Sequence, residues 1–341
     1  METRKLQEVG GGTYTVSIPK AWATARGLEA GTPVNLYTHL DGSIVIRSRA
    51  KDGDDLSSIR VEVDGGAERT KRALRAAQTV GFERVTLAAA SEFDAETCRA
   101  VRSLVRRFVG TELVDERGDE LVVRNLLDAS DVSVRQSVVQ LQYVALSVHE
   151  EATASFLDGD GDAYARLRER GTEAERLWGM VARHFSRGLV SLEEVDCVGV
   201  SRPGLFEYYE TARQLSRVAS DGIAIARVGQ GLTGALPDDV ACELSGVAND
   251  TRRAVERTAN TVLECEEPER IHDALDTCTE ARADLDALEA AVLDERDGTP
   301  MLERADVVAV ARCLDTLRRT LDHGCAIGNV ALRRSMRPDR L

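Results

Sequence analysis

The sequence predicts a multidomain, mainly helical protein that begins with a small β-rich domain. Three observations carry this prediction. Glycine-punctuated, alternating segments fill residues 1–50, strand and helix patterns alternate over residues 56–128, and helical periodicity alone runs through residues 131–341. A chain of 341 residues is long enough for two or three such domains.

Residues 1–50 are predicted to form two β-hairpins joined by one short helix. The Gly10–Gly12 loop precedes the segment 13–18, in which polar and apolar side chains alternate as in a half-buried strand. Pro19 ends this strand and suits the first turn of a helix. The second hairpin turns at Asp41-Gly42, a strong hairpin signal.

Two hairpins in about 50 residues cannot bury a core alone, so the sequence predicts that this domain dimerises. Residues 3–47 resemble the AbrB/SpoVT/MazE-type swapped-hairpin DNA-binding domain. The resemblance is carried by Arg4-Lys5-Leu6-Gln7, Gly10–Gly12, Val16-Ser17-Ile18-Pro19-Lys20, Gly27-Leu28, Gly31-Thr32-Pro33-Val34 and Asp41-Gly42-Ser43. It implies a swapped-hairpin β-barrel shared by two chains, and it implies binding to DNA.

The charge of the chain is unevenly distributed. Seven basic residues against four acidic ones give residues 1–51 a net charge of +3, which leaves −17 for the rest of a chain at −14. We call residues 1–51 the head. Its positive charge, beside an acidic remainder of the chain, is typical of a domain that binds phosphates. The candidate DNA-binding residues are Arg4, Lys5, Thr13, Tyr14, Lys20 and Arg26. In a twofold dimer they recur on one face, where basic side chains straddle phosphates and loop residues reach base edges. The alternative is a head that only dimerises the chain.

The amino-acid composition indicates the kind of organism and the cellular compartment of the protein. Four of the 44 basic residues are lysines and the other 40 are arginines. An acidic surface poor in lysine resembles that of proteins from salt-in halophiles, although a GC-rich genome gives the same bias. Seven scattered cysteines without a C-x-x-C spacing indicate free thiols in a reducing compartment. With no apolar leader and no apolar run of 18 residues, the sequence predicts a cytoplasmic protein.

Residues 56–128 are predicted to form a small α/β domain. Strand, helix and strand patterns at 59–63, 68–80 and 84–88 precede a second helix at 94–108 and a terminal hairpin. No glycine-rich phosphate loop follows either of the first two strands. The sequence therefore predicts a spacer or a regulatory module here.

The C-terminal region is predicted to hold two tandem three-helix bundles, at about 131–232 and 236–341. The six helices are expected at 132–157, 161–187, 203–230, 237–265, 268–295 and 300–334.

The third and sixth of these helices look alike. Each is predicted to begin at a proline, Pro203 or Pro300, and each then contains Arg-x-Leu, at 213–215 or 312–314. Spacings of 97 and 99 residues predict an internal duplication of the three-helix unit.

Residues 131–341 resemble the PhoU family, two tandem three-helix bundles associated with control of phosphate uptake. Pieces of its pattern are Ser147-Val-His-Glu-Glu151, Arg176-Leu-Trp178, Leu321-Asp-His323 and Ile327-Gly-Asn329. A swapped-hairpin head joined to such a tail is a known arrangement among archaeal PhoU-like regulators. The resemblance therefore implies a dimeric transcriptional regulator of phosphate homeostasis, whose tail senses phosphate status or receives it from a partner protein.

PhoU proteins usually carry an E-x-x-x-D pair, followed by histidine, in the third helix of each bundle. Two carboxylates four residues apart share a helix face and repel, so a divalent metal between them is physically sensible. In the first repeat the matching positions are Ser216 and Ser220, with Asp221 displaced by one residue. The first repeat thus departs from the family pattern.

The second repeat departs as well. One register pairs Asp315 with Arg319, and the other pairs Arg318 with Asp322. We predict that the two aspartates neutralise these arginines as i,i+4 pairs. A divalent metal held by Asp221, Asp315 and Asp322 is the less favoured alternative.

No catalytic residue and no required cofactor are predicted. The five histidines lie far apart in the sequence, and no G-x-S-x-G, Walker-type loop or H-E-x-x-H occurs. The expected partners are DNA and a second copy of the chain. The alternative to a DNA-binding regulator is an adaptor that never touches DNA and acts on a phosphate transporter's ATPase or a signalling kinase.

Overall fold

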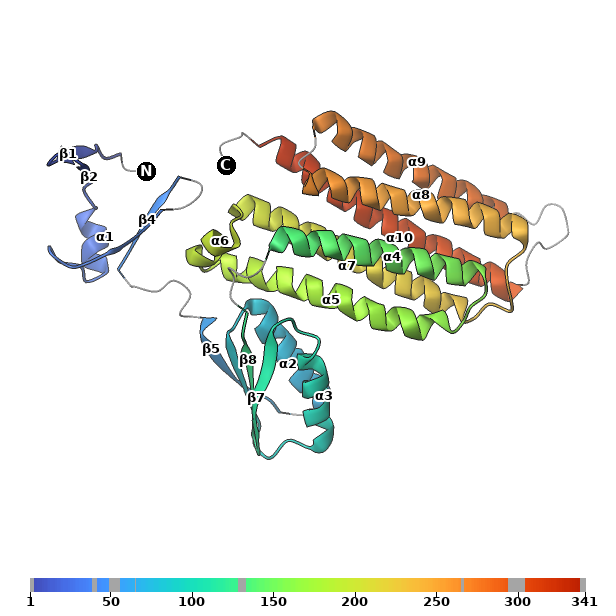
Figure 1. The fold of residues 1–341 in the computed structure, drawn as a ribbon, viewed down its shortest axis with the longest axis horizontal. Coiled ribbons are helices and arrows are strands. Elements are labelled where there is room, and N and C mark those ends of the chain that lie inside the picture. The colour runs from blue at the N-terminus through green and yellow to red at the C-terminus, as the bar shows by residue number, and fades with distance from the viewer. Residues whose placement is uncertain are drawn as a thin grey trace. The chain divides into compact units, whose positions relative to one another are not determined.

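The computed structural model describes residues 3–38, 42–48, 56–64, 66–127, 133–264, 267–293 and 304–337. The chain divides into two compact units, Met1–Asp52 and Gly53–Leu341. The described residues are mostly helical, with a small β region in the first unit (Figure 1).

The first unit contains two hairpins and one short helix. Its elements are β1 (Gln7–Val9), β2 (Thr13–Thr15), α1 (Lys20–Ala25), β3 (Asn35–Thr38) and β4 (Ile44–Arg47). β1 pairs with β2 and β3 pairs with β4, both antiparallel, so the two predicted hairpins are present. Gly10 has a φ of 53° in the first loop, a conformation that glycine adopts without a steric cost.

The strand predicted over residues 13–18 is shorter than expected. β2 ends at Thr15, and Val16 and Ile18 beyond it are exposed. A two-stranded ribbon with no layer packed on it gives these side chains nothing to contact within one chain. Of the predicted turn, Gly42 is described, with a φ of 78°, and Asp41 lies outside the described residues.

The second unit begins with a four-stranded sheet covered by two helices. The elements are β5 (Ser58–Glu62), α2 (Ala67–Val80), β6 (Arg84–Ala88), α3 (Ala95–Val105), β7 (Thr111–Arg117) and β8 (Glu120–Asn125). The strand order is β5-β6-β8-β7; β5 and β6 are parallel, and the other two pairs are antiparallel. Leu74, Val85, Leu87, Val101 and Leu121 lie in the core between the sheet and the helices. This is the α/β alternation that the sequence predicts.

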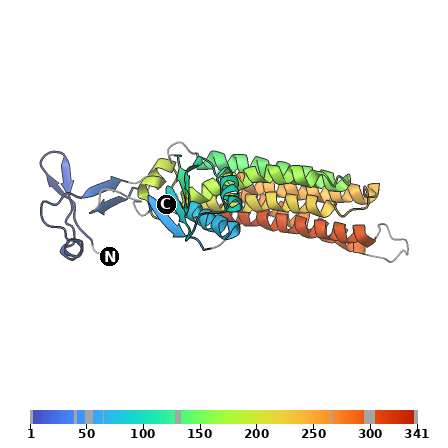
Figure 2. The same ribbon diagram turned by 90° about the horizontal axis from the view of Figure 1, so that it is seen from below.

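The rest of the second unit is built from long helices that lie side by side (Figures 1 and 2). They are α4 (Val134–Leu157), α5 (Ala163–Gly188), α7 (Arg202–Gly229), α8 (Asp238–Leu263), α9 (Pro268–Leu293) and α10 (Arg304–Ser335), and the short helix α6 (Leu192–Val198) connects α5 to α7. The predicted bounds that fall on described residues agree within two residues, whereas the predicted bounds at 132, 265, 295 and 300 lie outside the described residues. No described helix combines the length and the apolar composition that crossing a membrane requires.

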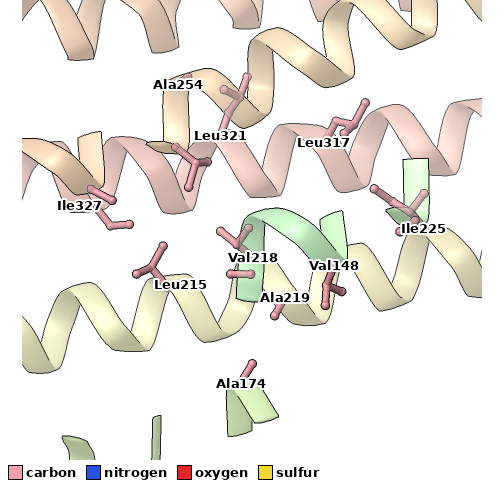
Figure 3. Packing of buried hydrophobic residues seen from close by; sticks show 14 of the residues in the cluster. Val148, Ala174, Leu215, Val218, Ala219, Ile225, Ala254, Leu317, Leu321 and Ile327 are labelled. Atoms are coloured by element: carbon pink, nitrogen blue, oxygen red, sulfur yellow. The ribbon is translucent and has the colours of Figure 1, made fainter. Parts of the chain in front are cut away.

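The long helices form two groups of three. α4, α5 and α7 contact one another, and so do α8, α9 and α10. Contacts of α7 with α10 and of α4 with α8 join the groups into one continuous core. Figure 3 shows buried side chains of this core, including Leu215 and Val218 of α7 and Leu317 and Leu321 of α10.

The buried positions of the two groups repeat in register. In the third helices, Leu215, Gly222 and Ile225 correspond to Leu317, Gly324 and Ile327, 102 residues later. The glycines also have equivalent neighbours: Gly222 lies against the backbone of His149, and Gly324 lies against the backbone of Val255. The structure therefore places the repeat at 102 residues in these helices, where the sequence predicts 97 or 99.

The short helix α6 was not predicted. Ser191 caps its first turn by accepting a hydrogen bond from the backbone N–H of Glu194 at 3.1 Å. Glu194 is buried and bonds to His184 Nδ1 at 2.6 Å and to Arg187 Nε at 2.7 Å. Burial alone would raise the pKa of Glu194, but the hydrogen bonds from these two side chains outweigh it and hold the pKa below its ordinary value.

Arg187 also joins the helical region to the α/β domain. Its guanidinium donates to the backbone oxygen of Gly81 at 2.9 Å and pairs with Glu83 at 3.3 Å. α2 packs on α5 along the same joint. The two parts of the second unit are therefore held together by buried and half-buried polar contacts.

Candidate functional site

The first unit leaves its apolar side chains exposed in a single chain. Among its described residues none is buried. The β3–β4 register pairs Leu36 with Ile46 and Thr38 with Ile44, which places these four side chains on one face of the hairpin. Leu36 and Ile44 are each 64% exposed. An apolar face without a covering layer is typical of an interaction surface.

The six candidate DNA-binding residues are all exposed and lie on separate elements of the first unit. Arg4 and Lys5 precede β1, and the β1–β2 register places Thr13 opposite Val9 and Tyr14 opposite Glu8. Thr13 and Tyr14 therefore lie near the tip of this hairpin, and as consecutive strand residues they point to opposite faces of it.

The other two candidates flank α1. Lys20 is its first residue and Arg26 is its C-cap. Six residues of helix separate them by about 9 Å along the axis. In one chain the cations are thus spread over the hairpin and the helix, rather than gathered in one cluster.

Residues 7–54 match the family described as antidote-toxin recognition MazE, bacterial antitoxin. The first unit is a MazE/AbrB-type domain. This confirms the prediction made from the glycine loop and the two hairpins. The match characterises the first unit alone, since it covers a small part of the chain. No curated protein matches the chain.

A cluster of polar side chains lies in the interface between α7 and α10. Asp221 is almost fully buried there, and its carboxylate lies 3.3 Å from Arg319 Nη2 and 3.4 Å from His323 Nε2. Thr320 Oγ1 donates to the same carboxylate at 3.4 Å. His323 Nδ1 lies 2.9 Å from Gln214 Oε1, so its ring is held from both sides.

The predicted partners of the third-helix arginines are correct in one case and wrong in the other. Arg319 pairs with Asp315 at 3.0 Å, as the i,i+4 spacing predicts. Arg318 instead reaches across to α9, where it pairs with Asp286 at 2.8 Å and Glu289 at 2.7 Å. Asp322 also pairs across, with Arg282 of α9. A neighbouring helix thus supplies better-placed partners than the same helix does.

These ion pairs decide whether Asp221, Asp315 and Asp322 could hold the divalent metal that the PhoU resemblance suggests. Asp221 and Asp315 share Arg319, and Asp322 has Arg282, so each of the three carboxylates already faces a guanidinium. A divalent cation would be repelled by these guanidinium charges. Within the described ranges, no group of three or more His, Cys, Asp or Glu side chains is placed to hold a metal ion. The residues do not fit a divalent metal centre.

His149 is a buried titratable residue that the sequence singled out only as part of the PhoU-like segment Ser147-Val-His-Glu-Glu151. It lies on α4 against Gly222, and neither ring nitrogen has a hydrogen-bond partner in the described part of the chain. Burial lowers its pKa to about 4; the charge of Asp221 opposes this shift and that of Arg252 adds to it. His149 is therefore neutral in the folded protein at pH 7.

Four arginines line one cavity between the α/β domain and α5, and the sequence singled out only Arg176 among them, within the segment Arg176-Leu-Trp178. They are Arg75 of α2, Arg107 beyond α3, and Arg176 and Arg183 of α5. No linear motif links residues of α2, of α5 and of the turn after α3, so a sequence pattern could not bring them together. The sequence signals were the segment Arg176-Leu-Trp178 and the excess of arginine over lysine, and neither predicts a cavity.

Proposed function

We propose that this chain is a dimeric, DNA-binding transcriptional regulator of phosphate uptake. The observation that carries the proposal is the MazE/AbrB-type domain at residues 7–54, in a head whose charge is opposite to that of the rest of the chain. Domains of this type suit DNA as a twofold dimer, because two copies present each cation twice. We propose no enzymatic activity for the chain.

Dimerisation of the head follows from its exposed apolar face. Leu36 and Ile44 have no covering layer in one chain, and a second copy would supply one. Burying a side chain of this size is favourable by about 1.5–3 kcal/mol. The proposed barrel is shared by two heads that exchange hairpins, and it closes the strand edges that one chain leaves open.

The phosphate link rests on the PhoU resemblance of residues 131–341. Its structural support is the pair of three-helix groups whose buried positions repeat at 102 residues in α7 and α10. In this proposal the helical tail senses phosphate status or receives it from a partner protein, and the head reads DNA. The tail binds no divalent metal in this mechanism, because arginines face its acids.

DNA recognition by this head must depend on short contacts. The composition resembles that of proteins from salt-in halophiles, whose cytosol is salty. At ~1 M salt the Debye length is about 3 Å, so a head with a net charge of +3 attracts phosphates only at contact distance. We propose that Arg4, Lys5, Lys20 and Arg26 hold phosphates and that Thr13 and Tyr14 lie near base edges. A twofold dimer then requires a roughly palindromic site.

The test is a titration of promoter DNA with the full chain, from low to molar salt. Arg4→Ala and Lys20→Ala should weaken binding and reduce the salt slope by about 1 for each phosphate contact removed, so by about 2 per dimer. Arg333→Ala is the matched control, since it removes an exposed arginine of α10, far from the head in sequence. Sedimentation should show that all three variants remain dimers.

The competing function is an adaptor that never touches DNA and acts on a phosphate transporter's ATPase or a signalling kinase. The observation that favours it is the small positive charge of the head beside the −17 of the remaining chain. If wild type and variants bind DNA equally, or without sequence preference at any salt, the adaptor is the better account.

A further inference from the structure

The cavity between the α/β domain and α5 is a candidate binding site. It has a volume of about 210 Å³ and lies inside the second unit, where α2 packs on α5. Its wall combines Gln78, Thr111 and Asn125 with the rings of Phe108 and Trp178. We call it the joint cavity.

The charge on the wall of the joint cavity is the opposite of that of the chain. Four arginines line it and Glu175 is the one carboxylate among its lining residues. Arg107 pairs with Glu175 at 3.4 Å. For Arg75, Arg176 and Arg183, no carboxylate of the described residues lies within ion-pair distance. In a chain with a net charge of −14, such a set of unneutralised cations favours an anion.

Arg183 is the buried member of this set. It is 8% exposed, and Nη1 donates to Gln78 Oε1 and to the backbone oxygen of Phe82, both at 2.9 Å. Nε is buried and has no partner within the described part of the chain. Neutral oxygens thus hold a guanidinium that burial has stripped of water, and burial, followed by the neighbouring charge of Arg187, lowers its pKa to about 10. A buried cation is costly unless an anion accompanies it.

The chain also keeps space open at this wall. Gly179, in the middle of α5, is a lining residue, and a Cβ built on it meets no atom within 4 Å. Glycine is a poor residue for a helix interior. Its presence here leaves room next to the arginines.

We propose that the joint cavity binds a small phosphate-bearing anion, either inorganic phosphate or a small phosphate monoester. Arg183 would meet the oxyanion at the inner wall, and the exposed Arg75 and Arg176 would close over it at the rim. The planar guanidinium fork matches phosphate oxygens in pairs, which favours this anion over a halide. A volume near 210 Å³ is below that of ordinary drug-sized sites and is too small for a dinucleotide.

This site deepens the proposed function, because a phosphate-bearing ligand there is a chemically direct signal of phosphate status. The ligand would touch the α/β domain through α2 and the helical tail through α5, so binding would tighten the joint between them. The biological role rests on the proposed function, whereas binding itself does not depend on DNA.

The test is calorimetry and thermal unfolding of the full chain at constant ionic strength. The probes are inorganic phosphate, glycerol 3-phosphate and AMP, with citrate as a carboxylate of comparable charge. We expect saturable binding of inorganic phosphate or a monoester and a rise in Tm, and binding of one but not the other identifies the source. Arg183→Gln, which retains a hydrogen-bond donor, should weaken binding at least tenfold.

A second variant separates binding from folding. Gly179→Leu adds a large apolar side chain at a lining position whose Cβ meets no atom within 4 Å, and it should abolish the ligand-dependent rise in Tm. Gly246→Leu on α8 is the matched control, because a Cβ there also meets no atom within 4 Å and the site is remote from the joint cavity in the fold. It should bind the ligand like wild type.

Three results would overturn the proposal: no phosphate-dependent change at millimolar concentrations, equal binding by wild type and both cavity variants, or binding of citrate without any phosphate compound. Loss of DNA binding in the Arg4→Ala and Lys20→Ala variants with normal phosphate binding would leave the joint cavity standing. Phosphate binding by a chain that never binds DNA would support the cavity and remove only the proposed function of the head.

Discussion

Asp221 of α7 and Arg319 of α10 form an ion pair across the seam between the two three-helix groups, with 3.3 Å between Oδ1 and Nη2. Arg319 has a second carboxylate partner, Asp315, on its own helix. The two acids differ in their surroundings, because the side chain of Asp221 is 11% exposed and that of Asp315 is 68% exposed. Arg319 thus forms one ion pair with a buried aspartate and another with a solvent-exposed aspartate.

The first prediction concerns this comparison. Asp221→Asn should lower the free energy of unfolding by about 1–3 kcal/mol, because a buried charge-assisted hydrogen bond is lost. Asp315→Asn should lower it by less than about 0.5 kcal/mol, because water and salt screen an exposed i,i+4 pair. Urea unfolding of the two variants at low and molar salt measures both values. Equal losses would contradict the burial difference.

The second prediction concerns metal removal. Arginines face Asp221, Asp315 and Asp322, so chelation with EDTA should leave the Tm of the full chain unchanged. Elemental analysis of the purified protein should find no stoichiometric Fe, Zn or Mg. A fall of many degrees in Tm after chelation would show that a metal stabilises the helical tail after all.

The sequence predicts local structure here better than it predicts contacts. Apolar periodicity predicted the described ends of the long helices to within two residues, because burial of one helix face produces that periodicity. The Arg-x-Leu match between the repeats gave 99 residues, whereas Gly222 and Gly324 give 102. This error of three residues is close to one helical turn, a shift that retains much of the apolar pattern.

Contacts between helices could not be predicted from the sequence, for a different reason. Arg318 has an aspartate four residues away, yet it pairs with two acids of α9, and nothing in the local spacing ranks these partners. The joint cavity is the same case, because Arg75 and Arg183 lie more than 100 residues apart and meet only when α2 packs on α5. The head differs, since its hairpins and glycine loop are local signals and were predicted correctly.

The third prediction concerns the close approach of α4 and α7. A Cβ at Gly222 would lie 3.0 Å from His149 Cα and 3.1 Å from its backbone nitrogen. Gly222→Ala should therefore lower the free energy of unfolding by about 1–3 kcal/mol, since backbone atoms must move apart. Gly246→Ala, with open space at its Cβ, should raise it by about 0.5–1 kcal/mol through helix propensity. Thermal unfolding of both variants decides this, and a stabilised Gly222→Ala would refute the tight contact.

The fourth prediction is a pH dependence that comes from His149. The folded-state pKa is about 4, below the ordinary value of 6.5, because the ring is buried. Above pH 6.5 the ring is neutral in both states and adds no pH dependence. Between pH 6.5 and 4 the unfolded chain binds the proton first, so the free energy of unfolding falls by up to about 3 kcal/mol. Below pH 4 this contribution is flat.

The measurement is urea unfolding of variants between pH 7.5 and 4. His149→Val introduces the residue found at the equivalent place in the second repeat, Val255, and should remove this part of the slope. His272→Val, at an exposed position of α9, should leave the slope unchanged. If His149→Val and wild type lose stability in parallel, the buried ring does not set the pH dependence.

The last prediction concerns assembly of the head. Leu36 shares one face of the β3–β4 hairpin with Ile44 and Ile46, whereas Asn35 points to the opposite face. If a second copy covers the apolar face, Leu36→Asp places a charge in the dimer core and should convert the head to an unfolded monomer, because an unpaired buried charge is far more costly than the burial it replaces. Asn35→Asp adds the same charge one residue away and should leave the dimer intact. Sedimentation and circular dichroism of the fragment 1–52, which should be folded only as a dimer, test both variants. A folded monomer of the wild-type fragment, or equal dimerisation of the two variants, would exclude the shared barrel and leave this apolar face for another partner.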